Sequence, residues 1–121
     1  MIAKDIVVKF YESVAILSKN YLQEVLHEEL LLDWTSSKGF VQLDKDDILA
    51  LSKEIRLNYY SLRCEVHQVI AEGNQVAIRY THYVSTFENP DEELVLATFN
   101  ATWELKDGLL YRGYQMSHLV I

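Results

Sequence analysis

The sequence predicts one α+β domain, residues 1–121, in which helices pack on one face of an antiparallel sheet. Apolar residues recur every three or four positions through much of the first half, which is the period of an amphipathic helix. From Ser61 onward they alternate with more polar residues, which is the period of a strand. Helices followed by strands, rather than alternating with them, are typical of α+β domains. The length of 121 residues suits a single domain.

Two helices are expected before residue 28. The first spans residues 2–18, where one face gathers the apolar residues Ile2, Ile6, Phe10, Val14 and Leu17. A second, short helix follows, with Asn20 and Gln23 as its capping pair. Both helices present an apolar stripe, so both are predicted to pack against the sheet.

A strand and a third helix are expected next. The apolar run within residues 28–37 is too short for another full helix. The Ser-Ser-Lys-Gly cluster at residues 36–39 ends this run, so a strand and a loop are predicted. The third helix begins near Asp44, whose carboxylate can accept hydrogen bonds from the free N–H groups of the first turn. Asp46 and Asp47 suit the positive end of its dipole.

The second half predicts strands joined by three hairpin connections. The clearest alternation places apolar residues at Val76, Ile78, Tyr80, His82 and Val84. Gly73-Asn74 and Asp107-Gly108 form two-residue turns, because glycine and asparagine tolerate the positive φ that such turns require. Residues 89–92, which contain Pro90, form a longer loop between the other two strands.

Charge and composition argue against several classes of partner. The net charge is −7, and the 11 lysines and arginines are scattered, so no nucleic-acid partner is expected. No segment approaches the roughly 20 apolar residues of a membrane span. Lys9 and Glu12 interrupt the first apolar run, so it is not a signal peptide. The one cysteine, Cys64, cannot form an internal disulfide, and a cytoplasmic protein with no membrane partner is predicted.

Several short motifs, taken in order, resemble one family. Residues 8–13 form an aromatic opening, residues 65–77 read as strand, tight turn and strand, and residues 107–110 precede Tyr114 in a last hairpin. This order resembles the nuclear transport factor 2-like superfamily, with its SnoaL-like polyketide cyclases and ketosteroid isomerases. The resemblance covers nearly the whole chain. It implies a cystatin-like cone, an α+β barrel with three helices packed on a curved antiparallel sheet, an apolar pocket at the open end, and a homodimer formed through the back of the sheet.

The resemblance argues against ketosteroid isomerase activity. By counting, the position of the isomerases' aspartate base falls on Trp34, and that of their tyrosine falls on Phe10. The position of their protonated acid falls near Ala101. A neighbour one position along a strand faces the other side of the sheet, so Asp33 does not replace the base. Asp33 is a catalytic candidate only if it points inward, and the family register turns it outward.

Two histidines are the main catalytic candidates. The SnoaL-like cyclases use an aspartate near the end of the last strand, and by counting its place falls at or near His118. Histidine can take and give a proton near neutral pH. His82 lies on the apolar face of its own strand, so His82 and His118 are predicted to form a proton-handling pair. Alternatively, both are ordinary strand histidines held by hydrogen bonds.

No metal or other cofactor is expected. His67, His82 and His118 fall on three different strands, without the close ligand spacing of zinc motifs. Neither a glycine-rich phosphate loop nor a nucleophile elbow occurs in the sequence.

Aromatic residues supply the candidate ligand surface. The residues expected to contact a ligand are Trp34, Tyr80, Trp103, Tyr114, Met116 and Tyr11. Two functions stay open on this basis. In the first, a SnoaL-like domain binds a small apolar or aromatic molecule and performs cofactor-free acid–base catalysis of the isomerase, cyclase or hydrolase type. In the second, the aromatic residues fill the cone as core, and the chain is a non-catalytic dimeric module that binds a ligand or a partner.

Overall fold

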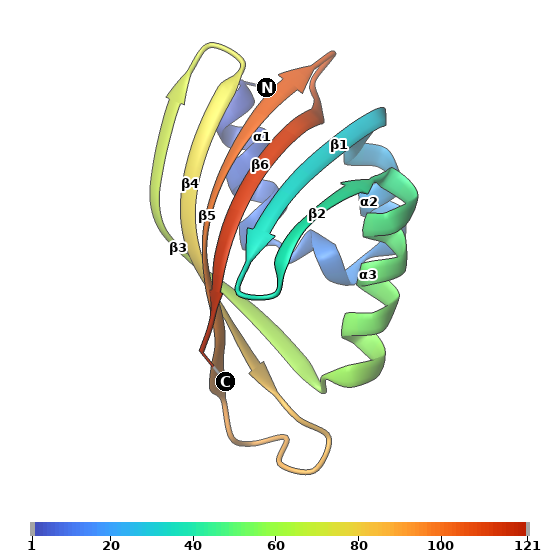
Figure 1. Cartoon of the computed structure of the whole chain (residues 1–121), viewed down its shortest axis with the longest axis vertical. Coiled ribbons are helices and arrows are strands. Elements are labelled where there is room, and N and C mark those ends of the chain that lie inside the picture. The colour runs from blue at the N-terminus through green and yellow to red at the C-terminus, as the bar shows by residue number, and fades with distance from the viewer. Residues whose placement is uncertain (1, 121) are drawn as a thin grey trace.

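The computed structural model describes residues 2–120, which form helices packed against a curved six-stranded sheet (Figure 1). The helical elements are α1 Ala3–Glu12, the 3-10 turn η1 Ala15–Leu17, α2 Lys19–Val25 and α3 Lys45–Asn58. The strands are β1 Leu26–Ser36, β2 Gly39–Asp44, β3 Ser61–Glu72, β4 Gln75–Ser85, β5 Leu94–Lys106 and β6 Leu109–Leu119. The predicted α+β class is confirmed. Within residues 2–120, no helix has the length and apolar character needed to cross a membrane.

The first helix is shorter than predicted. α1 ends at Glu12, and Val14 adopts the left-handed conformation with φ of 52°, which no regular helix tolerates. The apolar spacing continues past this break through η1, so periodicity alone could not locate the end. The cap of α2 also lies two residues earlier than expected. Ser18, not Asn20, accepts the hydrogen bond from the Tyr21 amide, at 3.3 Å.

The start of α3 is as predicted. The Asp44 side chain accepts from the Asp47 amide, and the Asp47 side chain accepts from the Asp44 amide, which completes a capping box. The residues before it, however, form strand β2 rather than a loop. β2 lies at the edge of the sheet and is exposed at five of its six residues, so it lacks the alternation that reveals a half-buried strand.

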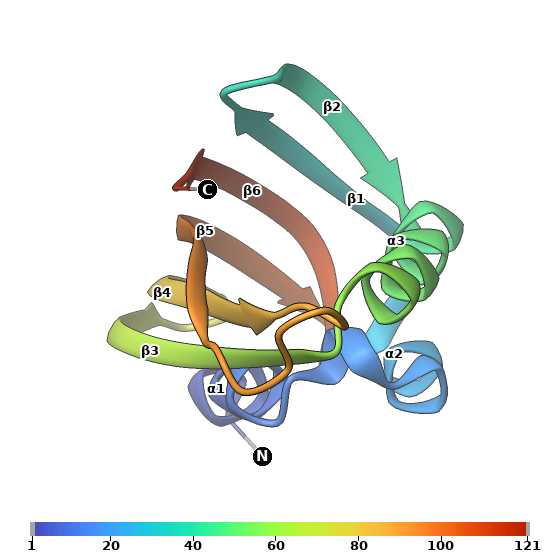
Figure 2. The same ribbon diagram turned by 90° about the horizontal axis from the view of Figure 1, so that it is seen from below.

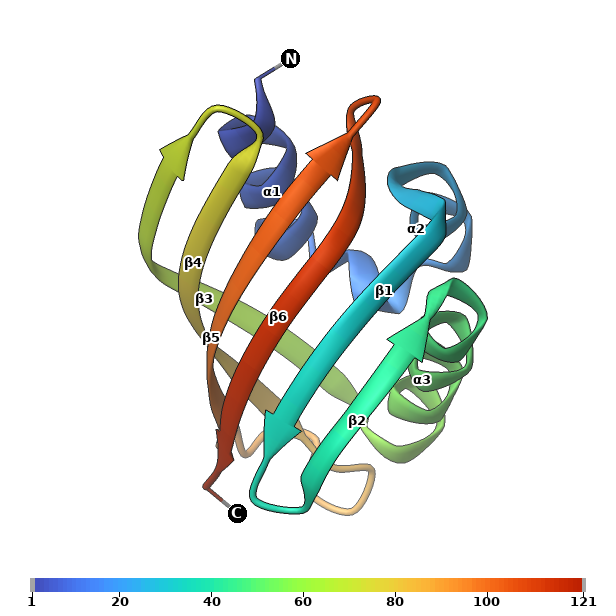
Figure 3. The same ribbon diagram turned by 45° about the horizontal axis from the view of Figure 1, so that its top comes forward.

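The sheet is mixed rather than wholly antiparallel. Its order is β2-β1-β6-β5-β4-β3, and β1 pairs with β6 in parallel (Figure 3). The other pairs are antiparallel, and both predicted two-residue turns are present. The hairpin rule fixes direction only between strands joined by a short turn, and β1 and β6 are separated by most of the chain. For that reason no local sequence pattern could predict the parallel pairing of β1 with β6.

The sheet is strongly bent from β2 at one edge to β3 at the other (Figure 2). We call the face toward the helices the inner face, and it carries the core. Trp103 packs against Gly113 of β6 on this face and is 2% exposed. Gly113 makes this contact possible, because a Cβ there would lie 2.6 Å from the Trp103 ring and 2.8 Å from Leu32. The opposite, outer face of the sheet is not covered by any described element.

Candidate functional site

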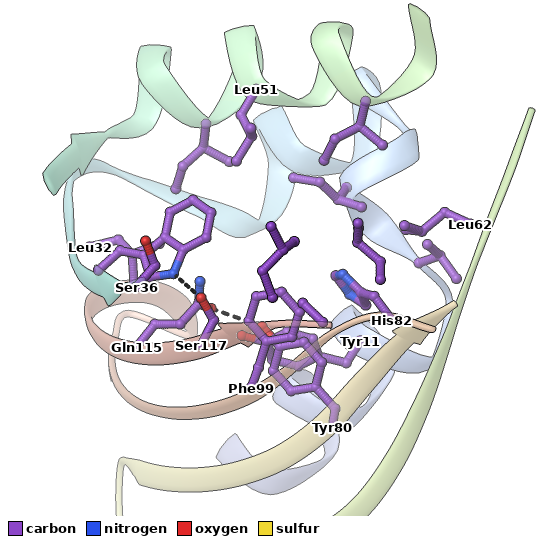
Figure 4. Close-up of a pocket in the computed structure, with 18 of the residues that line it drawn as sticks. Tyr11, Leu32, Ser36, Leu51, Leu62, Tyr80, His82, Phe99, Gln115 and Ser117 are labelled. Atoms are coloured by element: carbon purple, nitrogen blue, oxygen red, sulfur yellow. Dashed lines mark hydrogen bonds between the residues drawn. The ribbon is translucent and has the colours of Figure 1, made fainter. Parts of the chain in front are cut away.

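A cavity of about 390 Å³ opens between the inner face of the sheet and α3 (Figure 4). α1 and η1 close one side of it through Phe10, Tyr11 and Ala15. α3 contributes apolar side chains, among them Ile48 and Leu51, because its buried stripe faces the sheet. The sheet contributes Leu32, Trp34, Ser36, Leu62, Tyr80, His82, Leu96, Ala97, Phe99, Trp103, Gln115, Ser117 and Leu119. Many of these lining residues also belong to the hydrophobic core, so the cavity lies directly beside it.

Aromatic rings make up the centre of the cavity wall. Tyr80 stacks on Phe99 with ring centroids 4.7 Å apart and an angle of 7° between the planes. Tyr11 lies 4.3 Å from Tyr80 on the helical side, and Trp34 lies 6.5 Å from Phe99 on the other. These residues come from one helix and three different strands. Folding thus gathers rings that are far apart in the sequence into one mainly apolar surface.

His82 is the titratable imidazole in this wall. Its ring lies 4.8 Å from Phe99 and 5.2 Å from Tyr80. Burial among these groups lowers the pKa of His82 from 6.5 to about 4, because the charged form loses its hydration. No side-chain hydrogen bond joins the His82 ring to another of the described residues 2–120. The ring is therefore neutral near pH 7 and has a free nitrogen available as a proton acceptor.

Three hydrogen bonds fix the polar groups of the wall. Trp34 Nε1 donates to Ser117 Oγ, the Tyr80 hydroxyl donates to Gln115 Oε1, and Trp103 Nε1 donates to the Tyr11 hydroxyl, each at 2.8 Å. Burial raises the pKa of Tyr11 to about 12 and that of Tyr80 well above its usual value, so both phenols keep their protons. The polar side chains of this wall are thus held in set orientations.

The predicted pairing of His82 with His118 is wrong. From Gly113 onward β6 alternates, and Gly113, Gln115 and Ser117 occupy its inner face. His118 consequently lies on the outer face, where it is exposed, on the opposite side of the sheet from His82. Counting along the sequence reached the correct strand but the wrong side, since a shift of one residue exchanges the two faces.

The same alternation removes two residues from the predicted ligand surface. Tyr114 is 57% exposed and Met116 is 64% exposed, both on the outer face. Of the residues expected to contact a ligand, Trp34, Tyr80, Trp103 and Tyr11 line the cavity. Asp33 also points outward, where its carboxylate accepts a hydrogen bond from Gln42 Nε2 at 2.9 Å. Asp33 therefore contacts no part of the cavity.

Gln115 and Ser117 are two polar residues among the cavity residues that sequence reasoning missed, and Phe99 is an aromatic one. Both polar residues lie near the end of a strand, which usually indicates a solvated position. The usable signal was Gly113, whose missing side chain leaves room for Trp103 and so marks the inner face of β6. Within residues 2–120, histidine, cysteine, aspartate and glutamate do not gather in groups of three that could hold a metal ion.

Comparison with known proteins identifies the family. The model of the SnoaL-like domain matches residues 7–113, so the chain belongs to the SnoaL-like family, and the resemblance noted in the sequence is confirmed. No curated protein matches the chain significantly.

Solved structures share the fold at low identity. IdmH of Streptomyces antibioticus, a proposed polyketide cyclase, is 14% identical with a TM-score of 0.76 over 95% of this chain and 91% of that one. An LEH-like epoxide hydrolase of Mycobacterium tuberculosis is 14% identical with a TM-score of 0.74, over 95% and 81%. An NTF2-like protein of unknown function from Burkholderia pseudomallei is 15% identical with a TM-score of 0.68, over 93% and 88%. At these identities the likeness shows the NTF2-like cone and no particular activity.

Proposed function

We propose that the chain binds a small apolar molecule with at least one flat ring in this cavity, and that His82 exchanges a proton with it. The observation that carries the proposal is the unpaired His82 ring set in a wall of aromatic side chains. A volume of about 390 Å³ is within the range of small-molecule sites, roughly 300–1,000 Å³. Stacked rings such as Tyr80 and Phe99 offer a flat surface to a flat ligand.

Acid–base chemistry suits the state of His82. A neutral imidazole can accept a proton at neutral pH, whereas a protonated one cannot. The low pKa makes the ring a weak base in the empty cavity, and a bound ligand that develops negative charge would raise it. Proteins of the same fold are named as a polyketide cyclase and an epoxide hydrolase, which supports a reaction of this general type.

The proton transfer can be tested without knowing the natural ligand. The probe is 2-acetylnaphthalene, a flat ketone whose α-hydrogens exchange with D₂O when a base removes them. We expect the wild-type protein to accelerate this exchange and His82→Phe to lose about a hundredfold of the acceleration, a usual share for a general base. His118→Ala is the matched control, since it removes a histidine from the outer face, and it should exchange like the wild type. Equal exchange by the wild type and His82→Phe would disprove the role of His82.

We also infer that a second copy of the chain covers the outer face of the sheet. This face exposes Phe40, Ile70, Tyr114 and Met116 around one hollow. Clustered exposed apolar side chains are typical of protein interfaces. Arg79 and Asp33 line the same hollow, and a twofold arrangement can set the acid of one copy against the base of the other. This dimer is compatible with a catalytic or a purely binding role of the cavity.

A further inference from the structure

We propose that Gln115 and Ser117 form a subsite that holds a neutral oxygen acceptor of the bound molecule, such as a ketone or quinone carbonyl. The inference rests on the proposed ligand function and adds the chemical group that the ligand carries. Both side chains project from the inner face of β6, two residues apart, and Figure 4 shows them next to each other in the cavity.

Ser117 has a proton to offer. The indole nitrogen of Trp34 can only donate a hydrogen bond, so Ser117 Oγ must be the acceptor at 2.8 Å. The hydroxyl proton of Ser117 takes no part in that bond. No further hydrogen bond of this side chain is made among residues 2–120. Ser117 is therefore a donor that faces the cavity without a protein partner.

Gln115 has its amide N–H groups to offer. The Tyr80 hydroxyl occupies Oε1, and Nε2 bonds to no other described side chain or backbone group. Every fully buried side-chain nitrogen and oxygen among the described residues has a partner. Since Nε2 has none, it is not fully buried, and Gln115 is among the residues that line the cavity. The bond from Tyr80 thus holds the amide with its donor end toward a ligand.

The Tyr80 side chain is itself held in place. Its ring lies 4.3 Å from that of Tyr11 and 4.7 Å from that of Phe99. Trp103 Nε1 is a donor only, so the Tyr11 hydroxyl accepts from it at 2.8 Å. The Tyr80 hydroxyl donates to Gln115 Oε1, and this bond fixes which end of the amide carries the free N–H groups.

The donors define the kind of oxygen that fits. Neither Gln115 nor Ser117 carries a charge. Lys38 and Glu54 also line the cavity, but most of the lining is aromatic and aliphatic. A carboxylate buried here would lose hydration that two neutral donors do not replace. A carbonyl loses much less, and two donors can satisfy both of its lone pairs. A flat molecule bearing a ketone or quinone oxygen therefore matches both the wall and the subsite.

Two probes of nearly equal shape test the subsite. 2-Acetylnaphthalene carries a carbonyl, and 2-ethylnaphthalene does not. We expect wild-type protein to bind the ketone about tenfold more tightly than the hydrocarbon, and the infrared carbonyl stretch of the bound ketone to move to lower frequency. Gln115→Leu and Ser117→Ala should each lose most of this preference and retain affinity for the hydrocarbon. Thr98→Ala removes an exposed hydroxyl from the outer face of β5 and serves as the matched control, with the preference unchanged.

The outcomes separate the subsite from the function on which it rests. Equal binding of the two probes by the wild type, with an unshifted carbonyl stretch, would overturn the subsite and leave the ligand cavity standing. Binding of neither probe would overturn both. Because Ser117→Ala leaves Trp34 Nε1 without its acceptor, that variant can fail to fold. The infrared measurement on the wild type needs no variant and decides the question in that case.

Discussion

At the scale of single residues, the surroundings of His82 determine both its chemistry and its effect on stability. The imidazole gains the contacts of aromatic rings but loses water, so the fold favours its neutral form. The same burial that leaves a nitrogen free for a ligand makes protonation unfavourable in the folded state. Activity and stability should therefore depend on pH through one group.

Stability is predicted to fall when the pH drops below the ordinary pKa of histidine. The pKa of His82 is about 4 in the fold and 6.5 when unfolded, so the unfolded chain binds more protons between these values. Full stabilisation is present above pH 6.5 and is lost as the pH falls toward 4, by up to about 3 kcal/mol for the whole shift. Urea unfolding of the wild type and of His82→Phe at about pH 7 and pH 4 measures the difference. A wild-type loss no larger than that of His82→Phe would contradict the assignment.

The sequence predicted the residue types of the site more accurately than the side of the sheet on which each residue lies. His82, Trp34 and Tyr80 were placed inward correctly, because each sits in a stretch with a clear alternation of apolar residues. His118 was misplaced, because the end of β6 mixes polar and apolar residues on both faces and only the register of pairing fixes the side.

At the scale of elements, α3 forms one wall of the cavity, so its start must be held in place. Asp44 and Asp47 satisfy each other's backbone amides there, and Lys45 bonds to Glu28 at 2.8 Å and to the Gln23 carbonyl at 3.0 Å. These contacts tie α3 to β1 and α2. The helix is thus held at the end that joins it to β2.

Removal of the cap should destabilise the protein measurably. Asp44→Ala deletes one half of the capping box and is expected to lower the free energy of unfolding by about 1 kcal/mol. Asp46→Ala, which removes an exposed charge from the same turn without breaking a cap bond, should lose no more than a few tenths of that. Chemical denaturation of both variants provides the comparison. Equal losses would mean that charge rather than capping stabilises this turn.

Elements with a strong local signal were predictable, and features without such a signal were not. The Asp44 cap and the two-residue turns depend on residues within a few positions of each other. β2 exists because β1 pairs with it, and the break at Val14 lets the chain turn from α1 into η1. Neither leaves a mark in the period of the apolar residues.

At the scale of the whole molecule, the outer face of the sheet is the largest feature still without a role inside the chain. Its hollow, which exposes apolar side chains and is also lined by Arg79 and Asp33, is the place of the proposed second copy. The cavity lies on the other side of the same sheet. Dimer formation should therefore leave ligand binding intact.

Charge placed on the outer face should separate the two copies. Met116→Lys and Tyr114→Lys each introduce a charge where the proposed interface buries an apolar side chain, and native mass spectrometry should show a shift from dimer to monomer. Lys106→Ala, at the exposed end of β5, is the control and should remain dimeric. A wild-type protein that is monomeric at all concentrations would rule out the interface.

The place of β6 in the sheet also has a consequence for how the molecule is made. β1 and β2 form one part of the sheet, β3, β4 and β5 form the other, and only β6 pairs with both. During synthesis each part keeps an unpaired strand edge until residues 109–119 have left the ribosome and can pair with both parts. The strand that then joins them is the one that carries Gln115 and Ser117. The nascent chain thus acquires its central strand and the donor side chains of its cavity in the same late event.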